Sequence, residues 1–174
     1  MILLKKIFAT ITMVAFFTPI ELEKKIILDN KVEILMPKEW KPMSEELIKR
    51  KYPGTHPPQL VYSDVSGGIS LAFNHTDTKA SPAILEKHRE VLKTSLENAY
   101  PHSLWEEEGI KEINGKKVGF FRLITDTPND RIYNYIVFTD LDGKLLICSF
   151  NCVEKKLKDW KPVAQEIMNS MSFR

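Results

Sequence analysis

RIYNYIVFTDLDGKLLICSFN, residues 131–151 of this chain, has the pattern of two strands joined by a turn at Asp140-Leu141-Asp142-Gly143. Alternate residues of a strand point to opposite faces of a sheet. Both faces of the first strand are apolar, with Ile132, Ile136 and Phe138 on one and Tyr133, Tyr135 and Val137 on the other. A sheet that is apolar on both faces must be covered on both. We therefore predict an α+β fold in which an antiparallel β-sheet is sandwiched between helices.

Two segments have the pattern of the covering helices. The first begins at Ser81-Pro82, an N-cap residue followed by proline at the first helical position. Apolar residues then recur at helical spacing as far as Ala99, and Pro101 ends the helix. The second is EKKLKDWKPVAQEIMNSM, residues 154–171, in which we expect a break near Lys161-Pro162 because proline disrupts a helix interior.

A further hairpin is predicted within residues 104–125. Its Asn114-Gly115 dipeptide is typical of a two-residue type I′ turn. If Ile113 pairs with Lys116, Glu107 lies opposite Arg122, and a cross-strand pair of opposite charge supports that register.

The remaining elements are shorter. Ser44 is a suitable N-cap for a helix that begins with two glutamates and ends with Lys49-Arg50-Lys51. Strands are predicted in KVEILMP (31–37), QLVYS (59–63) and ISLAFNH (69–75), and an irregular loop in YPGTHPP (52–58). We expect residues 21–174 to form a single domain, since their number suits one core better than two.

The N-terminal stretch MILLKKIFATITMVAFF has the form of a secretory signal. Two lysines precede the apolar run Ile7–Phe17, which is too short to span a bilayer. We expect residues 1–20 to be a signal peptide, the mature protein to be periplasmic or secreted, and the mature chain to contain no integral membrane segment. The alternative is an N-terminal core strand in a cytoplasmic protein.

The balance of charged residues bears on the class of partner. Lys5 and Lys6 account for the excess of 25 basic over 23 acidic residues, so the rest of the chain is balanced and nucleic acid is not an expected partner.

Cys148 and Cys152 lie four apart on a predicted strand, about 13 Å along it, which is too far for a disulfide. We expect two unpaired thiols that pack as small apolar groups.

No catalytic residues, metal site or cofactor are predicted. The sequence has neither the G-x-S-x-G motif of a nucleophile elbow nor a glycine-rich phosphate loop. His75 and Asp77 would share one face of a strand and could face one ion, but a stable metal site needs three or four ligands.

One polar cluster interrupts an apolar face of the hairpin at 131–151. Pairing Thr139 with Lys144 would place Asn134 opposite Ser149, with Asn151 on the same face. Buried polar groups need partners, so these three residues are either a satisfied core network or the floor of a pocket. Asn134, Ser149 and Asn151 are our candidate ligand-binding residues.

The stretch KRKYPGTHPP, residues 49–58, is the candidate partner-binding segment. It contains Arg50, Lys51, Tyr52 and His56, and tyrosine and arginine are frequent anchors of protein interfaces. Such a long connection is often functional. The alternative is a solvated loop stiffened by proline.

The order of these elements, with the segments MPKEW, DGKLLICSFNC, DWKP and IMNSMSF, resembles the PsbP-like superfamily over roughly Lys31 to Phe173. That superfamily includes the PsbP photosystem subunit, bacterial DcrB proteins and a Ran-binding nuclear transport factor. The segments YPGTHPPQLVY and NHT are also similar to those of uncharacterised conserved bacterial proteins. The resemblance implies an α/β/α sandwich that acts as a binding or accessory module, usually without catalysis, and it carries over no binding residues.

Three hypotheses on function follow. The first is a non-enzymatic binding or accessory protein of the bacterial cell envelope, monomeric or weakly dimeric, that contacts an as yet unknown protein partner. The second is a cytosolic adaptor or immunity-type protein. The third is a small-ligand carrier or hydrolase that uses a cleft near Asn134 and His75.

Overall fold

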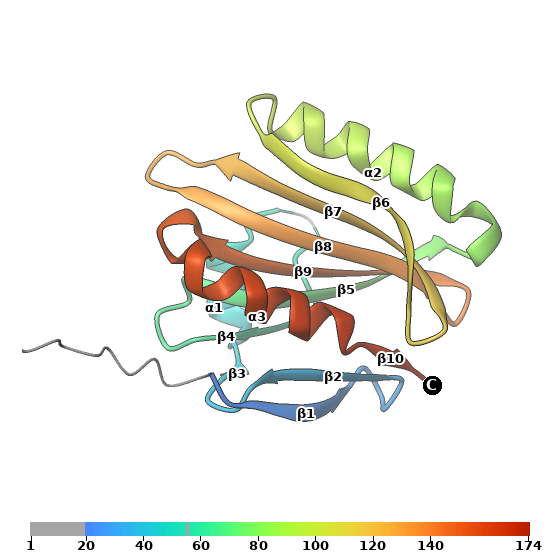
Figure 1. Ribbon diagram of the computed structural model, residues 1–174, viewed down its shortest axis with the longest axis horizontal. Coiled ribbons are helices and arrows are strands. Elements are labelled where there is room, and N and C mark those ends of the chain that lie inside the picture. Colours follow the sequence, from blue (N-terminus) through green and yellow to red (C-terminus); the bar gives the residue numbers. More distant parts are fainter. Residues whose placement is uncertain (1–19, 55) are drawn as a thin grey trace, which may run out of the picture.

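The structure is a computed structural model that describes residues 20–54 and 56–174. The predicted signal peptide, or alternative N-terminal strand, therefore lies outside the described residues except for Ile20. The described chain has the predicted α+β architecture, a large antiparallel sheet with helices on both faces (Figure 1). The fold class predicted from the sequence is confirmed.

The main sheet has seven antiparallel strands in the order β3-β4-β5-β9-β8-β7-β6. These are β3 (Lys41–Pro42), β4 (Leu60–Ser63), β5 (Ile69–Lys79), β6 (Leu104–Ile113), β7 (Lys116–Asp126), β8 (Arg131–Leu141) and β9 (Lys144–Val153). A second, antiparallel sheet has the order β1-β2-β10, with β1 (Leu22–Ile27), β2 (Val32–Pro37) and β10 (Ser172–Phe173). The helices are α1 (Glu45–Lys51), α2 (Leu85–Ala99) and α3 (Leu157–Asn169), and single 3₁₀ turns, Pro82–Ile84 and Glu154–Lys156, lead into α2 and α3.

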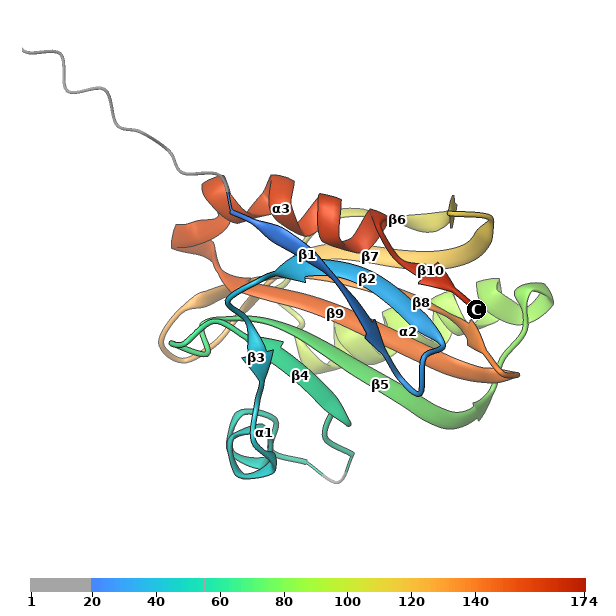
Figure 2. The same ribbon diagram turned by 90° about the horizontal axis from the view of Figure 1, so that it is seen from below.

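The two faces of the main sheet are covered by different layers. On one face, Leu85 of α2 packs with Phe121 and Phe138. On the other face, α3 and the small sheet lie side by side over the strands (Figure 2), and α3 buries Ala164, Ile167 and Met168. Both faces of β8, which are apolar in sequence, are thus covered by other elements.

The small sheet was not predicted as a separate unit. Strand β2 was expected from its residues, but β1 and β10 were not. Ser172 of β10 pairs with Glu33 of β2, which lies almost the whole length of the described chain away in sequence. Val32, Ile34 and Met36 alternate along β2 and are fully buried against the main sheet. This layer closes the core beside α3.

The β6–β7 hairpin has the predicted turn and register. Asn114 and Gly115 both adopt positive φ, at 48° and 80°, as a type I′ turn requires. Ile113 pairs with Lys116, and Arg122 Nη1 lies 2.8 Å from Glu107 Oε2 across the strands. The turn dipeptide and the charge pair predicted this hairpin correctly.

The β8–β9 hairpin differs from the prediction by two residues. Asp142 and Gly143 alone form the turn, with φ of 52° and 75°, so Leu141 pairs with Lys144. Asn134 consequently lies opposite Asn151, and not opposite Ser149. Because side chains alternate with a period of two, this even shift leaves the predicted polar residues on the same face.

The predicted break at Pro162 is wrong, because α3 continues through it from Leu157 to Asn169. Proline removes one backbone hydrogen bond from a helix interior, at a cost of about 3 kcal/mol. The three fully buried residues of the following two turns hold the helix against the sheet and offset that cost.

Both cysteines are unpaired and buried on the α3 side of β9, as the sequence predicted. Burial raises the pKa of each thiol. Cys148 and Cys152 act in the fold as small apolar side chains.

Candidate binding site

Helix α1 and the loop that follows it are placed over β4 and β5. The helix begins at Ser44, whose Oγ accepts a hydrogen bond from the Leu47 N–H at 3.3 Å. Its buried residue, Ile48, packs on Val61 and Ala72. Ala72 belongs to the face of the sheet opposite the α3 core, so α1 and α2 cover neighbouring parts of the same face.

The end of α1 is fixed to β5 by a fully buried serine, Ser70. The Lys51 ammonium donates to Ser70 Oγ at 2.9 Å and to the Gly67 carbonyl at 2.5 Å. The Tyr52 hydroxyl also lies 3.2 Å from Ser70 Oγ. Burial lowers the pKa of the Lys51 ammonium and raises that of the Tyr52 hydroxyl. Lys51 and Tyr52 therefore anchor the loop, although Lys51 is partly exposed, and Arg50 and His56 are exposed beside them.

A cavity of about 240 Å³ lies between this loop and the end of α2, and we call it the α1–α2 pocket. Its walls come from the loop and α2, and its floor from β5, β8 and β9. The lining residues are Tyr52, His56, Pro58, Ala72, Phe73, Asn74, Leu96, Tyr100, Asn134, Ile136, Ile147, Ser149 and Asn151. All three predicted ligand-binding residues and two of the four predicted partner-binding residues thus meet in one place.

The polar floor of the pocket is partly engaged within the protein. Asn134 Nδ2 donates to Thr125 Oγ1 at 3.0 Å and to the Ile132 carbonyl at 2.9 Å. Asn151 Nδ2 donates to Asn134 Oδ1 at 2.6 Å. Within the described chain, the Ser149 hydroxyl and the Asn151 Oδ1 have no hydrogen-bond partner, and both residues line the pocket. The floor can therefore donate a hydrogen bond to an uncharged polar group and accept one from it.

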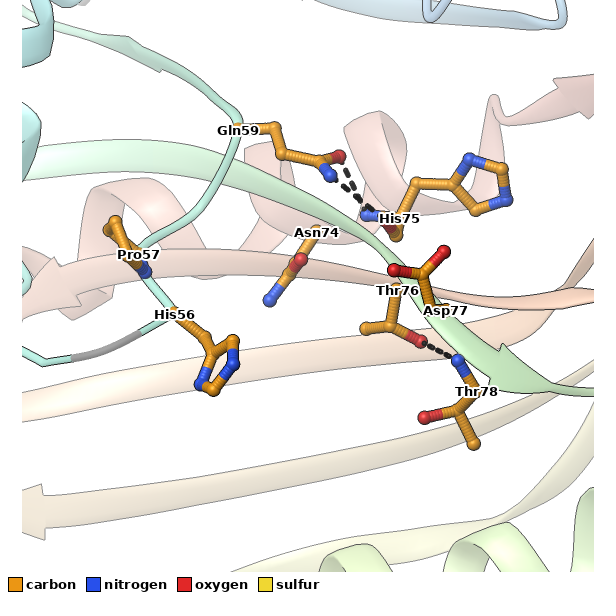
Figure 3. A pocket seen from close by; sticks show the side chains of 8 residues that line it. All are labelled: His56, Pro57, Gln59, Asn74, His75, Thr76, Asp77 and Thr78. Carbon is orange, nitrogen blue, oxygen red and sulfur yellow. Dashed lines mark hydrogen bonds between the residues drawn. The ribbon is translucent and has the colours of Figure 1, made fainter.

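A second, larger cavity of about 780 Å³ runs beside the far end of β5 (Figure 3), and we call it the edge groove. It is lined by His56, Pro57 and Gln59 of the loop and by residues 74–78 of β5. The Gln59 carboxamide bonds the backbone of His75 twice, since its Nε2 donates to the carbonyl at 2.9 Å and its Oε1 accepts from the N–H at 3.1 Å. The loop thus separates the two cavities and fastens to β5 at both ends.

The structure does not bring together the two residues named in the hydrolase hypothesis. Asn134 lines the α1–α2 pocket, whereas His75 lines the edge groove. Figure 3 shows the His75 ring pointing away from His56, and its Nε2 lies 2.9 Å from the Leu141 carbonyl. Asp77 pairs with Lys144 at 2.7 Å, which lowers the pKa of its carboxyl group. Among the described residues, no three histidines, cysteines or carboxylates are grouped to hold a metal ion.

Most other lining residues were not singled out from the sequence, and four of them come together from distant parts of the chain. Leu96 lies in the last turn of α2, and Tyr100, which directly follows the helix, is 41% exposed. Gln59 and Asn74 meet only because β4 pairs with β5. An exposed tyrosine immediately before Pro101 was the one local signal available.

Within residues 20–54 and 56–174, no helix has both the length and the apolar character needed to cross a membrane.

Comparisons with known proteins find likeness in structure and not in sequence. No protein-family model matches the chain, and no curated protein matches its sequence. The solution structure of cyanobacterial PsbP (CyanoP) from Synechocystis sp. PCC 6803 aligns with a TM-score of 0.66 at 10% identity, over 94% of this chain and 99% of that one.

Two further structures are similar over nearly all of this chain. PA94 from Pseudomonas aeruginosa, a protein of unknown function described as a putative regulator, aligns with a TM-score of 0.52 at 11% identity, over 88% of this chain and 97% of that one. The Ran-binding protein Mog1p of Saccharomyces cerevisiae aligns with a TM-score of 0.48 at 10% identity, over 88% of this chain and 96% of that one. Identities this low establish architecture alone: this chain adopts a PsbP-like fold.

Proposed function

We propose that this chain is a non-enzymatic binding or accessory protein of the bacterial cell envelope that acts through protein–protein contacts. The surface that we assign to this role is the loop surface, formed by Arg50, Tyr52, His56 and the neighbouring Tyr100. The observation that carries the proposal is the anchoring of this long loop, through Lys51 and Tyr52 to Ser70 and through Gln59 to His75, between two cavities.

An anchored loop suits partner binding because little conformational entropy is lost when it docks. Long connections that are kept in place tend to be functional. Tyrosine and arginine are over-represented among the side chains that contribute most to interfaces, and this surface presents two tyrosines and one arginine. The pocket and the groove on either side of the loop supply concave features that a partner's side chains can enter.

The assignment to the envelope rests on the N-terminal sequence, with its two lysines and its apolar run. Intact mass measured on protein from fractionated native cells tests it. A species about 2 kDa below the 20.1 kDa full length, in the envelope fraction, is expected for a cleaved signal. Full-length protein in the cytosol would overturn the assignment and favour the cytosolic adaptor or immunity-type hypothesis.

Affinity purification from that fraction tests the binding role. The bait is the mature chain, compared with Arg50→Ala/His56→Ala on the loop surface and with Lys87→Ala/Lys158→Ala as a matched control at exposed positions away from it. We expect one stoichiometric partner with the wild type and the control, and its loss with the loop variant. Equal recovery by all three proteins would exclude the loop surface, and recovery of no stoichiometric partner would contradict the binding role.

The α1–α2 pocket supports a second candidate function, the carriage of a small uncharged ligand. Its floor offers the unpartnered Ser149 hydroxyl and Asn151 Oδ1, and no Asp, Glu, Lys or Arg lines it among the described residues. Native mass spectrometry of protein purified from its own cells would show a bound small molecule. Filling the pocket by Ser149→Leu should remove that adduct, and an adduct that survives the substitution would contradict carriage in this pocket.

A further inference from the structure

The far end of β5 is an open sheet edge. Strand β4 pairs only with Ser70–Phe73, and Figure 2 shows β5 continuing beyond it. On the inner side, β9 pairs with β5 as far as His75 and again at Lys79. Thr76, Asp77 and Thr78 lie in a bulge between these pairs, and within the described chain they have no strand partner on either side. Unpaired backbone groups at a sheet edge form a template for another strand.

The inner side of this stretch is completed by a side chain. The Thr76 hydroxyl donates to the Leu145 carbonyl of β9 at 3.1 Å and accepts from the Thr78 N–H at 3.2 Å. The first bond links β5 to β9 where the ladder is interrupted, and the second satisfies the Thr78 N–H within β5. On the outer side of β5, which faces the edge groove, no side chain of the described residues bonds the backbone beyond His75. The unpaired backbone groups therefore lie on the outer side.

The side chain of Gln59 marks where an added strand would begin. Its carboxamide bonds both the N–H and the carbonyl of His75, the pattern that a paired strand residue makes. The carbonyls of Phe73 and His75 both accept from Gln59, so outward backbone groups alternate along β5 up to the irregularity in its pairing with β9 between His75 and Lys79. By this alternation we assign the Asp77 N–H as the next outward group. Asn74 and Thr78 lie four residues apart, at most about 13 Å at the rise of a strand.

Resting on the proposed binding role, we propose that an extended segment of a partner protein adds to β5 as a short strand beyond Gln59, bonding the backbone of Asp77. The groove is polar, and its one carboxylate, Asp77, is neutralised by Lys144. An uncharged polar segment therefore fits it best. The groove shares His56 with the loop surface, so one partner can occupy both.

The other sheet edges and a second copy of the chain fit this role less well. Strand β6 places Glu106, Glu107 and Glu108 along its edge, and β1 carries Glu23, Lys24 and Lys25, which are charges that discourage strand addition. Pairing β5 with β5 of another copy would bring two copies of the loop at residues 56–59 together. A single extended peptide would meet only one such loop.

Substitution at Asp77 tests the backbone contact. Asp77→Pro removes the outward N–H at an exposed edge position, where proline is tolerated by the fold, and Asp77→Asn keeps the N–H while removing the charge. The probes are short peptides selected from a displayed random library on the wild-type chain, together with the partner from the affinity purification. We expect Asp77→Pro to weaken binding of both by about tenfold or more, as the loss of one or two backbone hydrogen bonds predicts, and Asp77→Asn to bind like the wild type.

A second measurement guards against a folding defect in Asp77→Pro. Amide hydrogen exchange on the wild-type chain should show the Asp77 N–H protected when peptide or partner is bound, and methylation of alternate peptide nitrogens should abolish peptide binding. Binding that is unchanged by Asp77→Pro, or an Asp77 amide that stays unprotected in the complex, would overturn strand addition. If the loop variant still loses the partner in that case, the proposed function stands and only the strand-addition inference fails.

Discussion

The side-chain carboxamide of Gln59 bonds both backbone groups of His75, donating to the carbonyl at 2.9 Å and accepting from the N–H at 3.1 Å. A side chain here takes the place of a strand residue at the point where β4 has ended. The contact fixes the far end of the loop surface and sets the limit of the open edge of β5. The loop, the pocket and the groove are therefore one connected region.

Changing Gln59 to Glu should show how much the hydrogen bond from Gln59 Nε2 to the His75 carbonyl contributes to stability. The carboxylate cannot donate to the His75 carbonyl, so we expect the free energy of unfolding at pH 7 to fall by about 1 kcal/mol. Protonation of the new carboxyl below about pH 4.3 restores a donor, so the deficit relative to wild type should shrink as the pH falls. Denaturant unfolding of both proteins at several pH values measures this difference, and a deficit independent of pH would contradict the contact.

Gly119 lies opposite Phe138 in the β7–β8 pair, and the ring occupies the space that a side chain would need. A Cβ at Gly119 would lie 2.0 Å from Phe138 Cζ, and Phe138 is fully buried. Gly119→Ala should lower the free energy of unfolding by about 1–3 kcal/mol through overpacking. The control is Gly54→Ala, where no atom lies within 4 Å of the new Cβ and stability should hardly change.

Tyr133 and Tyr135 are both fully buried on β8 but differ in their hydroxyl groups. The Tyr133 hydroxyl has no hydrogen-bond partner within the described chain, whereas the Tyr135 hydroxyl accepts from Lys111 Nζ at 2.8 Å. Tyr133→Phe should therefore leave stability unchanged or raise it by up to about 1 kcal/mol, while Tyr135→Phe lowers it by about 1 kcal/mol. Equal losses in denaturant unfolding would show that the Tyr133 hydroxyl is bonded after all.

The two buried thiols should react slowly in the folded protein. Burial raises the pKa of the Cys152 thiol to about 11 and that of Cys148 further, so little thiolate forms at pH 8. Iodoacetamide labelling followed by mass spectrometry should modify neither cysteine in the native state at pH 8. Both should be modified in denaturant, and labelling of Cys152 in the native state should become detectable only as the pH approaches 11. Rapid native labelling at pH 8 would contradict their burial.

Local signals were enough for much of the fold. Asn114-Gly115 and the Glu107–Arg122 pair specified the β6–β7 hairpin, because turn chemistry and one charge pair fix a register. In β8–β9, the prediction assigned four residues to a turn that Asp142-Gly143 makes alone. The polar residues were still assigned to the correct face, since a shift of two residues does not exchange the faces of a strand.

Features that depend on distant packing were beyond local signals. Pro162 indicated a break that the buried residues of α3 override. Pairing of β10 with β2 joins residues at opposite ends of the described chain, for which no periodicity gives a sign. At the site, the sequence identified Asn134, Ser149 and Asn151 as one face, but only the placement of α1 and α2 shows that they lie beneath His56.

Site-specific photo-crosslinking in native cells tests whether the loop surface contacts a protein partner. A photo-reactive amino acid placed at His56, on the loop surface, is compared with the same amino acid at Lys158 on α3, both of which are exposed positions. We expect one discrete crosslinked partner in the envelope fraction from position 56, its loss on Arg50→Ala, and no such product from position 158. The same products from both positions, or no protein adduct from position 56, would contradict a binding role for this surface.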